Sequence, residues 1–470
     1  MRPSTRESWS EIEDLLSAVL SRVKPSREER LKVGRVASSV IANAKRVVRE
    51  LDLRSSVEMH GSYAKDTWLS GEADLDLFIL FDLECTLDEA LSQGLRAAKL
   101  VASKLRAPWR ECYAAHPYIE ATVNGITVDL VPGFKVERAG EVRTPVDRTR
   151  LHTLYVLRNM PRSLRDDVRL LKRFMKGVGV YGAEVRVQGF SGYMCELLIL
   201  AFGSFLEALR HVAKWRPYRV VIDIEGHFSE GKVPDKMVSP LVVVDPVDPS
   251  RNAAAAVSEE SMYRIIAASR RFLVRPSIRF FFQEHTSPSV SELKARISER
   301  GTYVFALRFP RPPYPEEIVW GQLRRSERGI RRFVEKLGVE VYGVTSWICD
   351  DKALILVEVP VSQLPSVELH MGPPVGSPEE QRFILKYISL GVAGPFIRNG
   401  RWYVLRRRRL TRLVDILKER LSEVGLSTAV RDSIERGLEV LEGPEVAEGC
   451  PDPKYRAFLL GWLRRRERWL

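Results

Sequence analysis

The sequence predicts a multidomain α/β (α+β) protein. Strands and helices alternate up to about Phe134, helical periodicity dominates from Arg148 to about Phe272, and short strands accompany one long helix from Pro276 to about Val359. The 470 residues exceed one ordinary domain, and the 45% hydrophobic content suffices for several cores. We therefore expect domains at residues 1–147, 148–275, 276–364 and 365–470.

Two helices open the chain. The first is expected from about Glu7 to Val23, and the second begins after Ser26, which with Glu29 three residues later forms a capping box. A short strand, Arg54 to His60, then leads into Gly61-Ser62. A glycine there lets the backbone approach a ligand, and a helix N-terminus after it offers free N–H groups to a phosphate.

Three aspartates follow on neighbouring strands. Asp74 and Asp76 stand at i and i+2, so both side chains leave one face of a strand. Asn124-Gly125 predicts a hairpin turn, and Asp129 lies on the alternating strand after it. An isolated Asp-x-Asp is more often a solvated strand edge, but three acids beside a phosphate-binding turn favour a site for Mg²⁺.

The remaining elements differ between the three later regions. Helices are expected at Val168 to Met175 and at Met194 to Leu209, where Glu196, Gly203 and Glu207 interrupt the apolar run and favour a buried core over a membrane span. The next region contains strand-like pieces and a helix, expected at Thr302 to Leu307, Glu316 to Leu337, Val339 to Val344 and Ala353 to Val359. From Pro365 onward we expect loops rich in proline and glycine, a short segment of mixed strands and helices, and a basic helical C-terminal end.

Composition points to the partner and the compartment. A net charge of +13 and a pI near 9.5 favour a polyanion, nucleic acid above all, and arginine clusters such as Arg406 to Arg409 suggest contacts with RNA phosphates. The cysteines lie far apart, so we expect neither a disulfide framework nor a zinc site, as suits a cytoplasmic protein. The N-terminus does not read as a signal peptide.

Several motifs together resemble one family. Gly61-Ser62-Tyr63-Ala64-Lys65-Asp66-Thr67-Trp68-Leu69 is similar to a run in archaeal class I CCA-adding enzymes, which share the polymerase beta-like nucleotidyltransferase head. The segments 147–153, 171–184, 245–252 and 394–402 extend the likeness over most of the chain. The resemblance implies a catalytic head at residues 1–147, a nucleotide-binding helical neck, an RNA-binding body and a tRNA-binding tail.

It also implies the reaction. Such enzymes add C, C and A to the 3′ end of tRNA from CTP and ATP without a template, releasing pyrophosphate. Two Mg²⁺ ions would be held by Asp74 and Asp76, with Asp129 contacting only the ion at the nucleophile. The resemblance further assigns nucleotide-binding residues, and it suggests a homodimer. These residues are Gly61, Ser62, Lys65, Thr149, His152, Lys172, Tyr181 and Arg251.

Two departures and two alternatives remain. Asp74 stands where relatives often have Glu, and Lys65 replaces a more typical Arg, exchanging a flat bidentate donor for a point charge. A poly(A)- or oligo(A)-adding polymerase would share the same head. A non-catalytic RNA-binding scaffold would be expected to lose at least one acid, yet all three are present.

Overall fold

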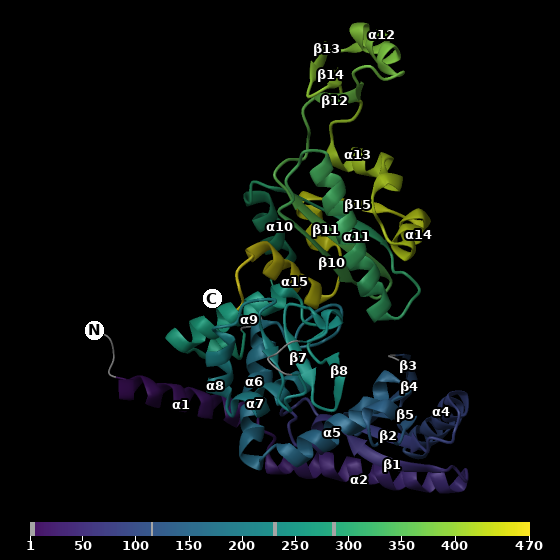
Figure 1. Ribbon diagram of the computed structural model, residues 1–470, viewed down its shortest axis with the longest axis vertical. Helices are drawn as coiled ribbons and strands as arrows, with labels where there is room; N and C mark the ends of the chain where they lie inside the picture. The colour runs from purple at the N-terminus through teal and green to yellow at the C-terminus, as the bar shows by residue number, and fades with distance from the viewer. Residues whose placement is uncertain (1–4, 114–115, 229–232, 284–287) are drawn as a thin grey trace. The chain divides into compact units, whose positions relative to one another are not determined.

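The computed structural model describes residues 5–113, 116–228, 233–283 and 288–470. Its chain forms two compact units, residues 1–284 with 466–470, and residues 285–465 (Figure 1). Each unit contains helices and at least one β-sheet, which confirms the predicted α/β class.

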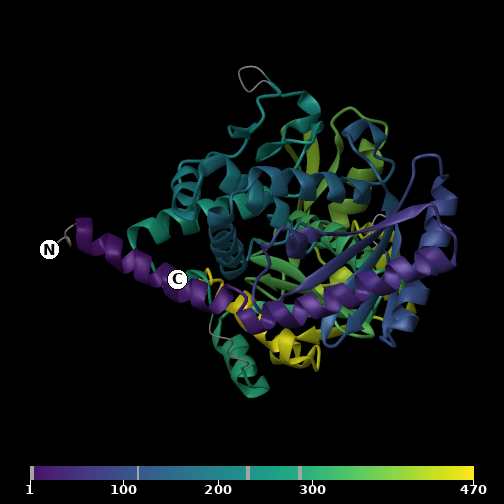
Figure 2. The ribbon, with the colours of Figure 1, turned by 90° about the horizontal axis from the view of Figure 1, so that it is seen from below.

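The first unit contains a five-stranded sheet in the order β1-β2-β5-β4-β3. Only the β2–β5 pair is parallel. The helices α2 and α4 pack on this sheet through apolar side chains, and Figure 2 shows α2 in purple along its strands. The bounds are α2 Arg27–Glu50, β1 Ser55–His60, β2 Asp74–Phe81, α4 Leu87–Lys104, β3 Trp109–Tyr113, β4 Pro117–Val123 and β5 Ile126–Phe134.

Local signals in the sequence set several of these boundaries. Asn124 and Gly125 have φ values of 51° and 77° and join β4 to β5, which confirms the predicted hairpin. Ser26 caps α2 by accepting a hydrogen bond from the Glu29 amide. The Glu29 carboxylate, however, accepts from Ser70 Oγ and Gly71 N, because that loop offers donors of its own. Glu29 therefore ties the helix to the chain just before β2.

Helices make up most of the rest of this unit. They enclose a core of aromatic rings in which Phe174 contacts Phe205, Phe272 and Phe280, and Trp469 stacks on Phe280. A small sheet of β6, β7 and β8 lies in the same unit. The bounds are α1 Thr5–Val23, α3 Gly61–Ala64, α5 Arg148–Asn159, α6 Arg165–Val178, α7 Gly192–Phe202, α8 Phe205–Val212, β6 Val221–Ile222, β7 Val242–Asp245, β8 Asp248–Asn252 and α9 Glu259–Val274.

The apolar segment predicted from Met194 to Leu209 is two helices, α7 and α8, meeting at 94°. Within the described residues no single helix is long and apolar enough to cross a membrane, although this bent pair passes the same test by length and composition. Residues of both helices lie in the buried core of the unit, as the sequence predicts.

The second unit is built on a sheet ordered β10-β11-β9-β15, with α11 packed against it. A separate three-stranded sheet, β12-β14-β13, packs on α12 through Phe383, Tyr387 and Val404. The bounds are α10 Val290–Glu299, β9 Tyr303–Pro310, α11 Glu316–Lys336, β10 Gly343–Ile348, β11 Lys352–Val359, β12 Val367–Pro374, α12 Glu380–Leu390, β13 Ala393–Arg398, β14 Arg401–Arg407, α13 Leu413–Glu419, α14 Thr428–Arg436, β15 Glu439–Glu442 and α15 Pro453–Arg464.

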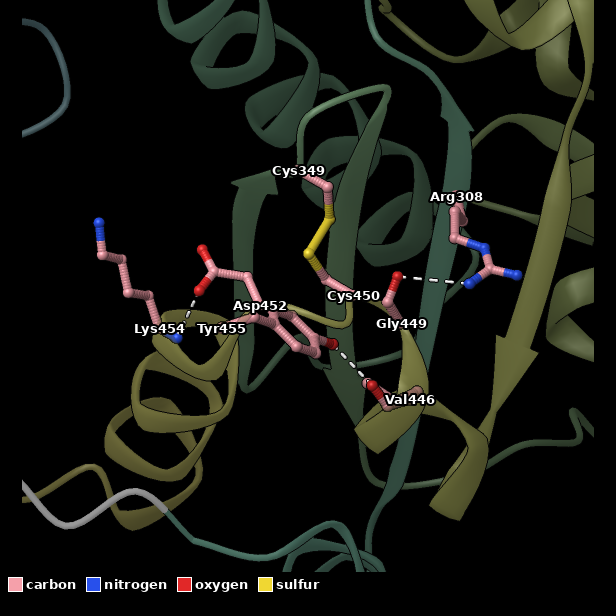
Figure 3. Close-up of a disulfide and its surroundings, with 8 residues drawn as sticks. All are labelled: Arg308, Cys349, Val446, Gly449, Cys450, Asp452, Lys454 and Tyr455. Atoms are coloured by element: carbon pink, nitrogen blue, oxygen red, sulfur yellow. Dashed lines mark hydrogen bonds between the residues drawn. A yellow bond between two sulfur atoms is a disulfide. The ribbon is translucent and has the colours of Figure 1, made fainter.

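Two expectations for this unit were wrong. The strand expected at Val339 to Val344 lies further along the chain, as β10. Val339 and Val341 precede that strand in a loop, and because their side chains are nevertheless buried in the core, their apolar pattern resembles that of a strand. Cys349 and Cys450 form a disulfide, although the sequence separates them by 101 residues (Figure 3). The fold brings the end of β10 to the segment before α15, and Tyr455 Oη donates to the Val446 carbonyl beside it. Distant cysteines alone give no such signal.

Candidate active site

The three aspartates lie on two neighbouring strands, β2 and β5. The parallel register sets Asp76 directly beside Asp129, and Asp74 beside Thr127. Adjacent strands lie about 4.8 Å apart, so the Asp76 and Asp129 side chains leave neighbouring points of one sheet face. Glu120 of β4 pairs with Asp129 on its other side and forms an ion pair with Arg110 at 2.8 Å, yet its charge still helps to raise the pKa of Asp129.

Gly61 brings the backbone against this carboxylate pair. It follows β1 directly, and the last residue of β1, His60, pairs with Asp76. Its φ is +69°, and a Cβ atom at this position would lie 1.8 Å from Asp76 Oδ2. Only glycine fits here. The helix that begins at Gly61, α3, is a single turn, so the phosphate-binding character of this segment comes from its backbone N–H groups more than from a helix dipole.

The three carboxyl groups are costly to ionise together. Burial, followed by the charge of Asp74, raises the pKa of Asp76 to about 6. Burial and then the charge of Asp76 raise the pKa of Asp129 to about 7. Burial and Glu72 also raise the pKa of Asp74. A cation placed among them would remove this repulsion.

The residues fit a divalent cation by their chemistry. Asp129 Oδ1 is buried and has no hydrogen-bond partner in the structure. Buried carboxylate oxygens are normally satisfied, and oxygen donors are what Mg²⁺ prefers. In the part of the chain that the structure describes, no three acidic, histidine or cysteine side chains already converge tightly enough to hold an ion. Like charges that repel are not expected to converge before the cation binds.

A buried charge network lies behind the Gly61 turn. Glu196 of α7 is fully buried and contacts Lys65 Nζ through Oε2 at 2.5 Å. Its Oε1 accepts from Thr67 Oγ1 at 2.6 Å and lies 3.6 Å from Lys172 Nζ. Burial alone raises the pKa of Glu196, but the two lysines outweigh it, and the net shift is downward. Lys65 and Lys172, both predicted to face the triphosphate, thus share one carboxylate.

Sequence reasoning missed Glu196. It treated this residue only as an interruption of an apolar run. The signal was nevertheless available, because a charged side chain inside a buried helix needs partners of opposite charge. Tyr181 borders the same network: its hydroxyl lies against the backbone of Gly192, and Lys176 Nζ lies 4.8 Å from its ring centre.

A second cluster surrounds Asp245, at the end of β7. This fully buried carboxylate contacts His152 Nε2 and Arg251 Nη1, both at 2.9 Å, and accepts from Tyr193 Oη at 3.2 Å. Burial raises the pKa of Asp245, but the hydrogen bond from His152 and the nearby charges lower it overall. The His152 ring stacks on Tyr193 at 3.9 Å. Asp245 and Tyr193 were not among the predicted site residues.

Thr149 and Ser62 occupy the edges of the site. The Thr149 carbonyl, in the first turn of α5, accepts from Thr153 Oγ1 at 2.8 Å, and that oxygen accepts from the Gly61 amide at 3.4 Å. The Ser62 carbonyl accepts from the Thr67 amide at 3.0 Å. Lys65 Nζ lies 5.8 Å from the Tyr193 ring centre, so the Glu196 and Asp245 clusters adjoin. All eleven predicted site residues thus belong to the first unit.

A mixed sheet with paired aspartates beside a glycine turn defines a nucleotidyltransferase. Residues 41–152 match the family model of the nucleotidyltransferase domain, and residues 166–282 match the tRNA nucleotidyltransferase second domain. Residues 300–443 match the C-terminal domain of CCA-adding enzymes.

Curated relatives cover nearly the whole chain. The CCA-adding enzyme of Pyrobaculum islandicum is 38% identical over 88% of this chain and 94% of its own length. The CCA-adding enzyme of Methanoregula boonei is 37% identical over 97% of this chain and 95% of its own length. The chain belongs to the family of CCA-adding enzymes, which are tRNA nucleotidyltransferases. Among solved structures, the Cid1 poly(U) polymerase is similar over 58% of this chain and 98% of its own, at 17% identity and a TM-score of 0.46.

Proposed function

We propose that this enzyme completes the 3′ end of tRNA by two-metal nucleotidyl transfer at Asp74, Asp76 and Asp129. The observation that carries the proposal is the register of β2 and β5, which sets Asp76 beside Asp129 next to the Gly61 turn. Bound there, two Mg²⁺ ions would supply activation of the 3′-hydroxyl and charge neutralisation of the leaving pyrophosphate.

The carboxylates have separate tasks in this proposal. Asp74 and Asp76 would hold both ions, and Asp129 only the ion beside the attacking hydroxyl. A carboxylate must stay ionised to hold a metal, and accepting a proton would end that role. None of the three aspartates therefore acts as a general base while a metal is bound. The unpaired Asp129 Oδ1 is the oxygen free to serve as a ligand.

The surrounding residues would bind the nucleotide. The Gly61 and Ser62 backbone would donate to the β- and γ-phosphates, and the Lys65–Glu196–Lys172 network leaves a net positive charge behind them. Thr149, His152 and Tyr181 would line the sugar and triphosphate. The Arg251 side chain, 41% exposed, is anchored by Asp245 yet open to solvent, which suits a donor to the incoming base.

The RNA contacts are assigned more coarsely. We propose that residues 1–147 act as head, 148–275 as neck, 276–364 as body and 365–470 as tail, with body and tail binding tRNA. Part of the arginine cluster is already paired: Arg406 and Arg408 contact Glu368, and Arg409 contacts Glu419. Arg407 is exposed. We also propose a cytoplasmic homodimer, which light scattering would test.

Incubation of the purified protein with tRNA lacking its last three nucleotides, Mg²⁺ and each nucleotide in turn tests the function. We expect two C residues from CTP alone, one further A when ATP is present, and then a stop. A long A tail would instead indicate a poly(A)-adding polymerase, and no extension would indicate an RNA-binding scaffold.

A further inference from the structure

A basic pocket of about 290 Å³ opens in the first unit, and Asp66, the residue after Lys65, lies in its wall. Two carboxylates, Asp66 and Asp166, lie in its wall. Five cations line it, namely Lys24, Arg30, Arg162, Arg165 and Arg169. We call it the arginine pocket. It is separate from the aspartate site, whose three acids are absent from its lining.

The charges in the arginine pocket do not balance. Asp66 is shared by Arg30 at 2.6 Å, Arg165 at 3.4 Å and Arg169 at 2.7 Å. Asp166 is shared by Lys24 at 2.6 Å and by Arg169 at 2.7 Å. The surplus is three positive charges within one cavity. A purely structural ion-pair network would be expected to match its charges more closely.

Two donors in the pocket are left over. Arg165 Nε is buried and has no hydrogen-bond partner. The Arg162 side chain is exposed, and no side-chain hydrogen bond or ion pair joins it to any described residue, although its backbone carbonyl accepts from the Arg165 amide. An unsatisfied buried N–H costs free energy that an acceptor would recover. The planar guanidinium forks of several arginines are suited to phosphate oxygens.

The position of Asp66 links this pocket to the active site. Asp66 has a φ of +52° and stands between Lys65 and Thr67, which both contact Glu196 on the catalytic side. Arg169 Nη2 donates to the Asp66 carbonyl, and its Nε donates to the Trp68 carbonyl at 3.0 Å. An anion that competes with Asp66 for its arginines therefore acts on the segment that positions Lys65.

We propose that the arginine pocket is a second binding site for phosphate-class anions. The ligand is either free pyrophosphate or a phosphodiester group of bound RNA, because both present the same oxygens to arginine. The inference does not depend on the catalytic assignment, because its binding assays contain EDTA and need no turnover.

The test measures binding by the full-length protein without divalent ions. Pyrophosphate affinity is measured by calorimetry, and tRNA affinity is measured across a salt series. The pocket variants are Arg162→Gln, which removes an exposed, unpaired side chain and should fold normally, and Arg162→Gln/Arg165→Gln. The matched control is Arg158→Gln/Arg216→Gln, which removes the same charge from exposed positions outside the pocket.

Each outcome either supports the anion site in the arginine pocket or overturns it. A fall of about tenfold in pyrophosphate affinity for the double pocket variant, absent from the control, supports the site with a free anion as its ligand. A fall in tRNA affinity, with a log–log salt slope shallower by about one to two units, supports the site with an RNA phosphate as its ligand. If both affinities match those of the control variant, the proposal is overturned.

Discussion

Glu196 offers the most informative single substitution in the catalytic unit. Lys65 and Lys172, with side chains only 8% and 3% exposed, depend on this one carboxylate. Glu196→Gln keeps the side-chain shape and the contact with Thr67 but leaves two buried cations without a counter-charge. Breaking a buried pair in this way costs about 3 kcal/mol or more. In a unit of this size we expect the melting temperature to fall by roughly 6–12 °C.

Activity should fall through nucleotide binding. Burial already lowers the pKa of Lys172, and Glu196 acts against that shift, so the pKa falls further without Glu196 and the positive charge that faces the triphosphate becomes easier to lose as the pH rises. We expect the KM for CTP to rise about tenfold, with a smaller change in kcat, and the KM defect to grow as the pH rises. Steady-state kinetics from pH 6 to 9 measure this.

Acid should remove the difference in stability between the wild type and the variant. The pKa of Glu196 lies below 4.5 in the fold, so its stabilising charge is present above that pH and is lost as the pH falls further. The free energies of unfolding of the two proteins should therefore converge as the pH falls through the lowered pKa of Glu196.

A second variant separates folding from binding. Lys65→Met/Glu196→Gln restores the net charge of the network, so stability should largely recover while the KM for CTP stays high. If Glu196→Gln melts and binds CTP like the wild type, the network has no such role. Recovery of KM together with stability in the double variant would show that the defect was only structural.

The remaining predictions concern three other sites. Gly61→Ala places a methyl group against Asp76 and puts alanine at a positive φ, so nucleotidyl transfer should fall by at least about a hundredfold, while stability falls by only about 1–2 kcal/mol. Normal activity would contradict the close approach of the Gly61 backbone to Asp76. Asp245→Asn removes the charge that orients His152 and Arg251, and we expect weaker discrimination between CTP and ATP in single-nucleotide assays, with Asp235→Asn as a control. Reduction of the Cys349–Cys450 disulfide should destabilise the second unit by about 4 kcal/mol, read by calorimetry with and without reductant, because it closes a loop of 101 residues; an unchanged transition would mean that the bond contributes nothing.

Much of the catalytic sheet could be predicted because its signals are local. Alternation predicted the strands of Asp74, Asp76 and Asp129, and Asn124-Gly125 predicted the hairpin that brings Asp129 to its place. Which strands pair, and whether they run parallel, depends on contacts between distant residues. The pattern led us to expect the acids on neighbouring strands, but it could not predict the parallel register that sets Asp76 directly beside Asp129.

The partners that orient the site could not be predicted. Glu196 lies 131 residues from Lys65, and Asp245 lies 93 residues from His152. Such pairs are set by how helices pack, and no spacing along the chain reveals them. The Cys349–Cys450 disulfide escaped prediction for the same reason.

In the proposed mechanism, Asp74, Asp76 and Asp129 share divalent ions. The most direct test is a crystal of the enzyme with Mn²⁺ and a non-hydrolysable CTP analogue, in which anomalous scattering locates the ions. We predict one ion within about 2.5 Å of oxygens from all three carboxylates, and a second within that distance of Asp74 and Asp76. Ions found only on the triphosphate, with Asp129 unliganded, would contradict the proposed site.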